Sequence, residues 1–129
     1  MTGVQTCALP ILFDKGYVYI QLKAYDDAIA VLTRVLSLQE DNHGALYNRA
    51  IAYLNSGKLD DARADYKELG QAFTNSYRIT YGLGEIAWRK HETNEAIRNY
   101  ELYLANTNTN TDEARTMIQR LRELKSKSP

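Results

Sequence analysis

The feature that most constrains this chain is a step of 34 residues that links three alanines, Ala28, Ala62 and Ala96. The same step links small residues in a second column and large apolar or aromatic residues in two others. These columns are Gly16, Ala50 and Gly84; Leu32, Tyr66 and Tyr100; and Val35, Leu69 and Tyr103. A period that is kept in several columns predicts an array of similar units that bury their apolar faces against one another.

Within one period the pattern predicts a helix, a turn and a second helix. Leu46, Ala50 and Tyr53 are spaced at i, i+4 and i+7, which places them on one face of a helix. Gly57 suits a left-handed break, and Asp60–Asp61 favours a new helix start because acidic side chains are stabilised at the positive end of the helix dipole. The predicted helix pairs are 10–22 with 26–38, 43–56 with 60–72, and 77–90 with 94–106.

The alternation of small and large residues predicts how the two helices of a unit meet. Two helices approach closely only where a side chain is little more than a methyl group, so the glycine and alanine columns are expected to form the seam. Tyrosines are expected to fill the space beside this seam. They are Tyr19, Tyr53, Tyr66 and Tyr100, and in the column that holds Tyr19 and Tyr53 the third member is the smaller Ala87.

The period, the helix–turn–helix plan, the small residue at position eight and the alanine at position twenty resemble the tetratricopeptide repeat. The resemblance implies an all-α fold, an α-solenoid of antiparallel hairpins. It divides 12–110 into three repeats, whose full registers are 9–42, 43–76 and 77–110. The frequent proline of the family is replaced by Glu40, Thr74 and Asn108. Gly70 stands where leucine is usual, which predicts an early end or a kink in that helix.

Residues 111–129 are predicted to form a capping helix and a frayed tail, because the last unit of an array has an exposed flank to cover. Thr109, Asn110 and Thr111 are candidate N-caps. The expected apolar stripe is Ala114, Met117, Ile118, Leu121 and Leu124, with Glu113, Arg115, Arg120, Arg122 and Glu123 on the other side. A helix that binds a partner is the alternative interpretation.

Residues 1–11 follow none of these columns and are poor in charge. Residues 2–11 back-translate without conflict to a string that resembles a widely used sequencing adapter. We therefore interpret 1–11 as a non-native segment. On this interpretation Cys7, the only cysteine, has no native role, and any targeting signal is missing. The compartment stays open between bacterial cytoplasm and periplasm.

The composition argues against several classes of function. Sixteen basic and sixteen acidic residues give a formal net charge of zero, so no basic face for nucleic acid is predicted. No apolar run approaches the roughly 20 residues that span a bilayer. His43 and His91 stand alone at helix boundaries, and no metal, phosphate or catalytic motif accompanies them. The sequence thus predicts neither an enzyme nor a cofactor.

The resemblance implies that the first helices line a concave groove that binds a protein or peptide. The groove residues carried over from the family are Phe13, Tyr17, Tyr47, Asn48, Ile51, Asn55, Arg78, Tyr81, Trp88 and Arg89, and the register adds Asp14, Ile20, Gln21, Leu54 and Glu85. Tyr47 and Tyr81 fit either the groove or packing against a neighbouring repeat.

The family's carboxylate clamp for acidic chaperone tails is not expected here. Its positions hold Phe13, Tyr17, Asn48, Arg78 and Gly82. Only Asn48 matches and Arg78 is a partial substitute, so the predicted ligand is partly apolar or aromatic. The predicted function is a protein-interaction scaffold. The alternatives are an accessory region of a larger enzyme or signalling protein, and a structural part of a bacterial envelope or secretion assembly.

Overall fold

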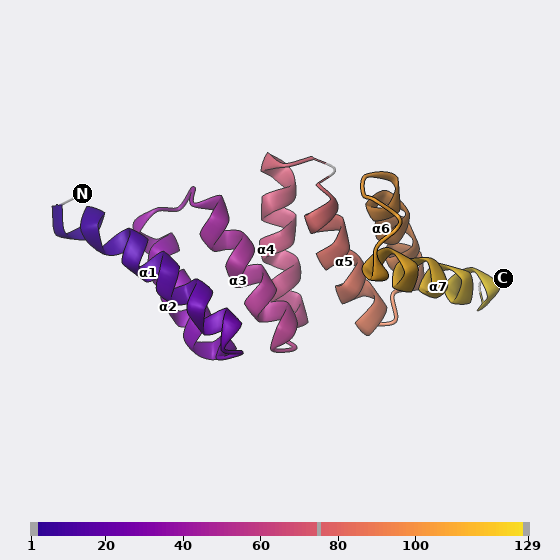
Figure 1. Ribbon diagram of the computed structural model, residues 1–129, viewed down its shortest axis with the longest axis horizontal. Helices are drawn as coiled ribbons and strands as arrows, with labels where there is room; N and C mark the ends of the chain where they lie inside the picture. The colour runs from indigo at the N-terminus through magenta and orange to yellow at the C-terminus, as the bar shows by residue number, and fades with distance from the viewer. Residues whose placement is uncertain (1–2, 75, 128–129) are drawn as a thin grey trace. The chain divides into compact units, whose positions relative to one another are not determined.

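The computed structural model describes residues 3–74 and 76–127, and within these residues all regular structure is helical. Figure 1 shows the helices in chain order. They are α1 (Gly3–Gln21), α2 (Tyr25–Leu38), α3 (His43–Asn55), α4 (Leu59–Ala72), α5 (Tyr77–Arg89), α6 (Thr93–Ala105) and α7 (Asp112–Lys127). The predicted all-α class is confirmed.

The ends of the six repeat helices agree with the sequence prediction to within one residue, except at the start of α1. This helix begins at Gly3 and continues through Pro10, whereas the repeat pattern placed its start at residue 10. That residues 1–11 are non-native stays a prediction. The expected early end at Gly70 is wrong, because α4 runs on to Ala72 and a Cβ atom at Gly70 would meet nothing within 4 Å.

The turns between the paired helices repeat the same backbone conformation every 34 residues. Lys23 (φ 59°), Gly57 (φ 84°) and His91 (φ 59°) all have positive φ. One residue further on, Ala24, Lys58 and Glu92 each donate a backbone N–H to the carbonyl of the residue five positions earlier, at 2.8–2.9 Å. This bond is that of a Schellman cap, which ends a helix at a left-handed residue.

The chain forms two compact units, Met1–Leu69 and Gly70–Pro129. In the first unit, α1 packs on α2, and α3 packs on both. Its core cluster holds Ala28, Leu32 and Val35 of α2 together with Ala45 and Ala52 of α3. In the second unit, α5 packs on α6 and α6 on α7.

The close seam predicted for the hairpins is confirmed in both units. A Cβ atom added to Gly16 would lie 2.6 Å from Leu32 Cδ2 in the first unit. In the second unit, a Cβ at Gly84 would lie 2.7 Å from Tyr100 Cδ1. Both distances are shorter than a van der Waals contact, so the neighbouring helix occupies the space that a larger side chain would need.

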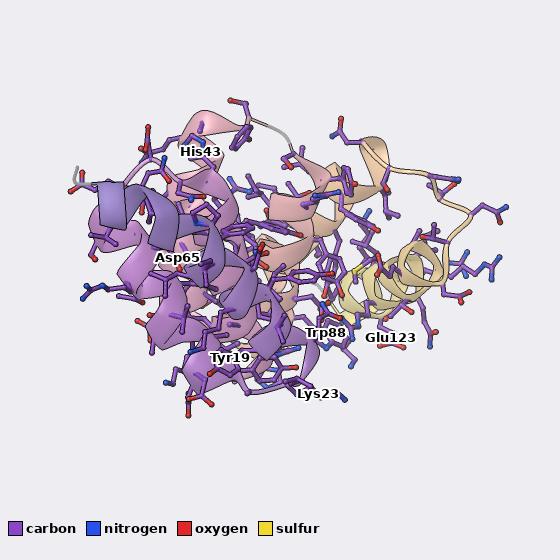
Figure 2. The ribbon with its side chains drawn as sticks, turned by 60° about the vertical axis from the view of Figure 1, so that its left-hand side comes forward. Tyr19, Lys23, His43, Asp65, Trp88 and Glu123 are labelled. Carbon is purple, nitrogen blue, oxygen red and sulfur yellow. The ribbon has the colours of Figure 1, made fainter. Side chains whose placement is uncertain are left out.

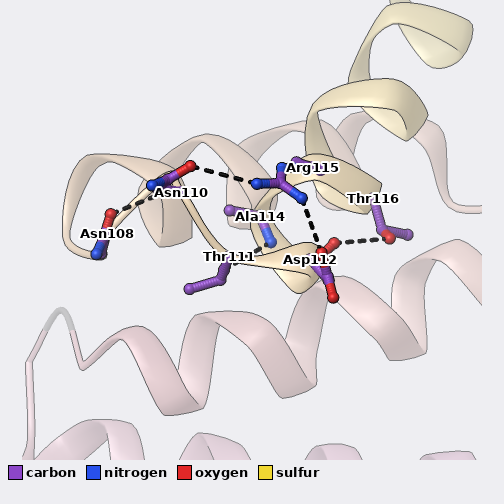
Figure 3. Close-up of polar contacts among 7 residues, drawn as sticks. All are labelled: Asn108, Asn110, Thr111, Asp112, Ala114, Arg115 and Thr116. Atoms are coloured by element: carbon purple, nitrogen blue, oxygen red, sulfur yellow. Dashed lines mark hydrogen bonds and ion pairs between the residues drawn. The ribbon is translucent and has the colours of Figure 1, made fainter.

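Helix α7 covers the apolar side of α6, as the capping prediction expected. Ala114, Met117 and Leu121 join Tyr100 and Tyr103 in one buried cluster. Thr111 is the cap among the three candidates, since its Oγ1 accepts the Ala114 N–H at 3.1 Å (Figure 3). The preceding loop is held by the Asn110 N–H, which donates to Asn108 Oδ1 at 2.9 Å.

Candidate functional site

The first unit displays an aromatic and amide surface on α1 and α3. Tyr17 is 53% exposed, and Asn55 at the end of α3 is exposed as well. Asn48 and Ile51 are half-buried on the same helix. Exposed tyrosine beside amide groups can contact both the apolar side chains and the backbone of a ligand. The binding role of these residues stays a prediction.

Phe13 and Tyr47 serve the core of this unit at least in part. Phe13 is half-buried against the core cluster, and its ring carbons would lie 3.2 Å from a Cβ at Gly44. The Tyr47 ring meets the buried Tyr66 ring edge-on, with centroids 6.4 Å apart. The packing interpretation that the sequence left open for Tyr47 therefore has a contact to support it.

A buried ion pair that the sequence did not predict joins α3 to α4. Arg49 donates from Nε and Nη2 to the two carboxylate oxygens of Asp65, both at 2.8 Å. The Asp65 side chain is 6% exposed and that of Arg49 19%. Hydrogen bonding to Asp65 raises the pKa of the guanidinium against the opposing effect of burial. Arg49 also lies over the ring of Tyr53, one turn further along α3, 5.6 Å from its centroid. The same side chain therefore contacts its own helix and the carboxylate on α4.

The predicted residues of the second unit lie on α5 in different environments. Arg78 and Arg89 are exposed, and the Arg78 guanidinium lies 5.7 Å from the centroid of the Tyr77 ring. Tyr81 is half-buried and packs against the buried Tyr103, with centroids 5.7 Å apart. Burial, followed by the charge of Glu85, raises the pKa of Tyr81, which keeps its hydroxyl protonated as a donor.

Glu85, which the family register placed toward the groove, is in fact buried. Its Oε1 accepts a hydrogen bond from the Tyr100 hydroxyl at 3.0 Å and a second one from Arg120 Nη1 of α7. The same Nη1 donates to the Tyr100 hydroxyl oxygen at 3.1 Å. We call Glu85, Tyr100 and Arg120 the α7 triad. It connects three helices through one carboxylate.

The α7 triad corrects the prediction for Arg120, which the amphipathic pattern had assigned to the outer face of the helix. The guanidinium turns inward and lies 4.7 Å from the centroid of the Trp88 ring. Figure 2 labels Trp88 among the side chains of the chain. Burial alone would lower the pKa of Arg120, but the bond to Tyr100 and the charge of Glu85 outweigh it and raise the pKa. Trp88 therefore has one ring face covered by a permanent cation.

The described residues contain no cluster of three His, Cys, Asp or Glu side chains that could hold a metal ion. In the same part of the chain, no helix has the length and apolarity needed to cross a membrane.

The helical hairpins share a turn conformation and a close seam, and a further helix covers the last of them. These features define the class of the protein, an α-solenoid of helical hairpins. The family model of the tetratricopeptide repeat matches residues 19–75 of the chain. No curated protein matches the chain by sequence. The solved structures described next share the fold of nearly the whole chain.

Solved structures with the same fold cover nearly the whole chain. The TPR domain of Arabidopsis OM64 is 19% identical with a TM-score of 0.81, over 92% of this chain and 98% of that one. The first TPR of Spaghetti (RPAP3), bound to HSP90 peptide SRMEEVD, is 24% identical with a TM-score of 0.78, over 92% and 90%. The Sgt2 TPR domain from Aspergillus fumigatus is 24% identical with a TM-score of 0.75, over 95% and 85%.

Proposed function

We propose that the chain is a protein-interaction module that binds a peptide or an extended protein segment on its first helices. The observation that carries this proposal is the 53% exposure of Tyr17 on α1, in a unit whose helix α3 carries the amides of Asn48 and Asn55. An exposed tyrosine offers a ligand a large contact area at low entropic cost. The solved RPAP3 domain with its bound HSP90 peptide supports the same use of this fold.

The ten predicted residues make up the proposed surface, divided between the units. Phe13, Tyr17, Tyr47, Asn48, Ile51 and Asn55 belong to the first unit, and Arg78, Tyr81, Trp88 and Arg89 belong to the second. Each set combines aromatic rings with hydrogen-bonding groups. The rings would take apolar side chains of a ligand, and the amide and guanidinium groups would hold its backbone carbonyls or carboxylates.

The proposed ligand differs from the peptide seen with RPAP3. That peptide, SRMEEVD, ends in acidic residues. In this chain Phe13 and Tyr17 stand at two of the positions where the family's clamp carries cationic or amide side chains. A dense run of carboxylates would be poorly compensated beside these rings, because a desolvated charge needs a partner. We therefore propose a ligand with apolar or aromatic side chains.

A selection from a random peptide library tests this proposal. Peptides that bind the chain should be enriched in apolar and aromatic residues. Their affinity should fall at least about fivefold for Tyr17→Ala, because a well-packed aromatic anchor contributes more than 1 kcal/mol. Since 1 kcal/mol corresponds to a factor of about five in affinity, a fivefold loss is the smallest that the proposal accepts. Arg34→Ala is the matched control, since Arg34 is an exposed residue of α2 in the same unit. Selected peptides that bind the Tyr17 variant as well as the parent chain would refute the proposed surface.

A further inference from the structure

The second unit contains an open cavity of about 290 Å³ between the α5–α6 turn and the end of α7. Its walls combine small apolar residues with an indole ring and charged or polar side chains. The lining residues are Ala87, Trp88, His91, Glu92, Thr93, Ala96, Leu124 and Lys127. All of them belong to Gly70–Pro129, so the cavity is complete within one unit.

The repeat columns show that one residue lining this cavity differs from its counterparts in the other repeats. Ala87 occupies the column in which the other two repeats carry Tyr19 and Tyr53. In the first unit the Tyr53 ring is half-buried and lies under the Arg49 guanidinium. Ala87 has no exposed surface, yet it presents only a methyl group where those repeats place a phenol ring. Ala87 lines the cavity, so a larger side chain at this position would compete with a ligand for it.

The walls of the cavity are suited to a second aromatic ring. Trp88 contributes its indole to the lining, and the Arg120 guanidinium stacked at 4.7 Å from the ring centroid holds this indole in place. Ala96 and Leu124 complete an apolar floor. Aromatic pairs prefer edge or offset contacts and gain more than their buried area alone predicts, so an inserted ring would find a prepared partner.

The rim of the cavity carries hydrogen-bond donors. Lys127 and His91 both line it. An ammonium group is a strong donor to carboxylate, and an imidazole can donate a further hydrogen bond. Glu92, the one acidic residue of the lining, has interactions of its own. A ligand with a carboxylate beside an aromatic ring would match both the apolar floor and the ammonium group of Lys127 at the rim.

We propose that this cavity binds an aromatic side chain next to a free carboxylate, as at the C-terminus of a peptide that ends in phenylalanine or tyrosine. The proposal rests on the function proposed above, because it names one anchor of the bound peptide. The ring of the ligand would pack against the indole of Trp88 and the side chain of Leu124, and its carboxylate would meet Lys127, all of which line the cavity.

The probe for this site is N-acetyl-phenylalanine, followed through the indole N–H signal of Trp88, the only tryptophan, in the NMR spectrum of the labelled chain. The signal should shift saturably, with a dissociation constant on the order of 1 mM for so small a ligand. N-acetyl-phenylalaninamide, which lacks the carboxylate, should bind at least about threefold more weakly. N-acetyl-alanine, which lacks the ring, should cause no saturable shift.

Two variants test separately what the aromatic ring and the carboxylate of the probe contribute to binding. Ala87→Tyr restores the side chain of the other repeats and should abolish binding of the probe, because the phenol fills the cavity. Lys127→Glu changes an exposed residue and should erase the preference for the acid over the amide. If Ala87→Tyr does not fold, the Lys127→Glu comparison alone decides. Unchanged probe binding in a folded Ala87→Tyr variant, or an acid preference that survives Lys127→Glu, would overturn the site.

The same experiments keep this inference distinct from the proposed function. If the probe fails to bind while library peptides still bind and depend on Tyr17, only the cavity assignment is wrong. If library selection yields no binder at all, the interaction module itself is wrong, whatever the probe does.

Discussion

The two compact units secure their hairpins by different means. In the first, Arg49 and Asp65 belong to consecutive helices of one hairpin and pair with each other directly. In the second, the carboxylate of Glu85 is paired by Arg120, which lies 35 residues later on the added helix α7. The α3–α4 hairpin thus neutralises its buried carboxylate with its own arginine. The α5–α6 hairpin needs α7 to compensate the buried charge of Glu85. A capping helix is usually explained by apolar coverage alone; here it also supplies a counter-ion.

The repeat columns of the sequence contain the same difference between the two units. Thirty-four residues after Arg49 stands Leu83, and thirty-four after Asp65 stands Asn99. The third repeat has therefore lost both partners of the ion pair. Asn99 instead donates from Nδ2 to the Glu95 carbonyl of its own helix at 2.9 Å. The cross-helix connection has moved to Glu85, two positions after Leu83, and to Tyr100, one position after Asn99.

The largest expected effect in the second unit comes from Arg120→Ala. This change leaves the Glu85 carboxylate, 9% exposed, with the Tyr100 hydroxyl as its remaining partner in the α7 triad. Breaking a buried ion pair on one side is strongly destabilising, so we expect a loss of about 3 kcal/mol in the free energy of unfolding. Urea denaturation followed by Trp88 fluorescence measures it within this unit.

The control for this change is Arg122→Ala, which removes an exposed arginine from the same helix and should cost less than about 0.5 kcal/mol. Equal shifts of the urea midpoint for both variants would mean that α7 is held by its apolar face alone.

A smaller loss is expected from Asp65→Ala in the first unit. Arg49 is 19% exposed, and its Nη1 keeps a bond to Thr33 Oγ1 at 3.3 Å, so the stranded guanidinium can still reach solvent. We expect a cost of about 2 kcal/mol. Circular dichroism during urea denaturation measures this loss, with Lys67→Ala as the control at an exposed position in the middle of α4. A cost above that of Arg120→Ala would reverse the proposed order of the two units.

Glycine substitutions compare the seam with a free helix surface. Gly84→Ala places a methyl group 2.7 Å from the Tyr100 ring, which the α7 triad holds at its hydroxyl end, so overpacking should cost about 1–2 kcal/mol. Gly70→Ala meets no neighbour and should stabilise α4 by about 0.5–1 kcal/mol, because alanine favours the helix. Thermal unfolding of both variants tests this pair, and a stabilising Gly84→Ala would contradict the seam.

The smallest effect is a dependence on alkaline pH. Burial, followed by the charge of Glu85, raises the pKa of Tyr100 above its ordinary value of 10.0. The folded state then holds the phenol proton more tightly than the unfolded state does. Its contribution to stability is therefore complete below pH 10.0 and is lost as pH rises toward the folded pKa. Tyr100→Phe should show a weaker decline of the urea midpoint above pH 10.0, and an identical decline would contradict this cause.

The sequence predicted the helices well because their ends are marked locally and repeatedly. Lys23, Gly57 and His91 share a left-handed turn, and the small residues at Gly16 and Gly84 meet the large columns as expected. Proline and glycine gave weaker signals, since α1 passes through Pro10 and α4 through Gly70. The packing of neighbouring turns overrides such single-residue preferences.

The polar interior was harder to predict because its partners are distant in the chain. A helical pattern assigns Arg120 to solvent, but arginine can bury its stem and carry the guanidinium inward. Glu85 was assigned to the groove from the family register. This register states which face of the helix a position lies on, and it does not state which charged residue pairs with the side chain. Opposite charges on facing helices, such as Arg49 and Asp65, offered the one usable signal, since the two residues lie on consecutive helices of the same repeat.

A double-mutant cycle on Glu85 and Arg120 tests the central claim most directly, that α7 closes the second unit through a buried ion pair. Glu85→Gln and Arg120→Gln, singly and together, are followed by Trp88 fluorescence in urea. Our account predicts a coupling free energy of at least about 1.5 kcal/mol between the two positions. Losses that add to within about 0.5 kcal/mol would show that the two side chains act independently and would contradict it.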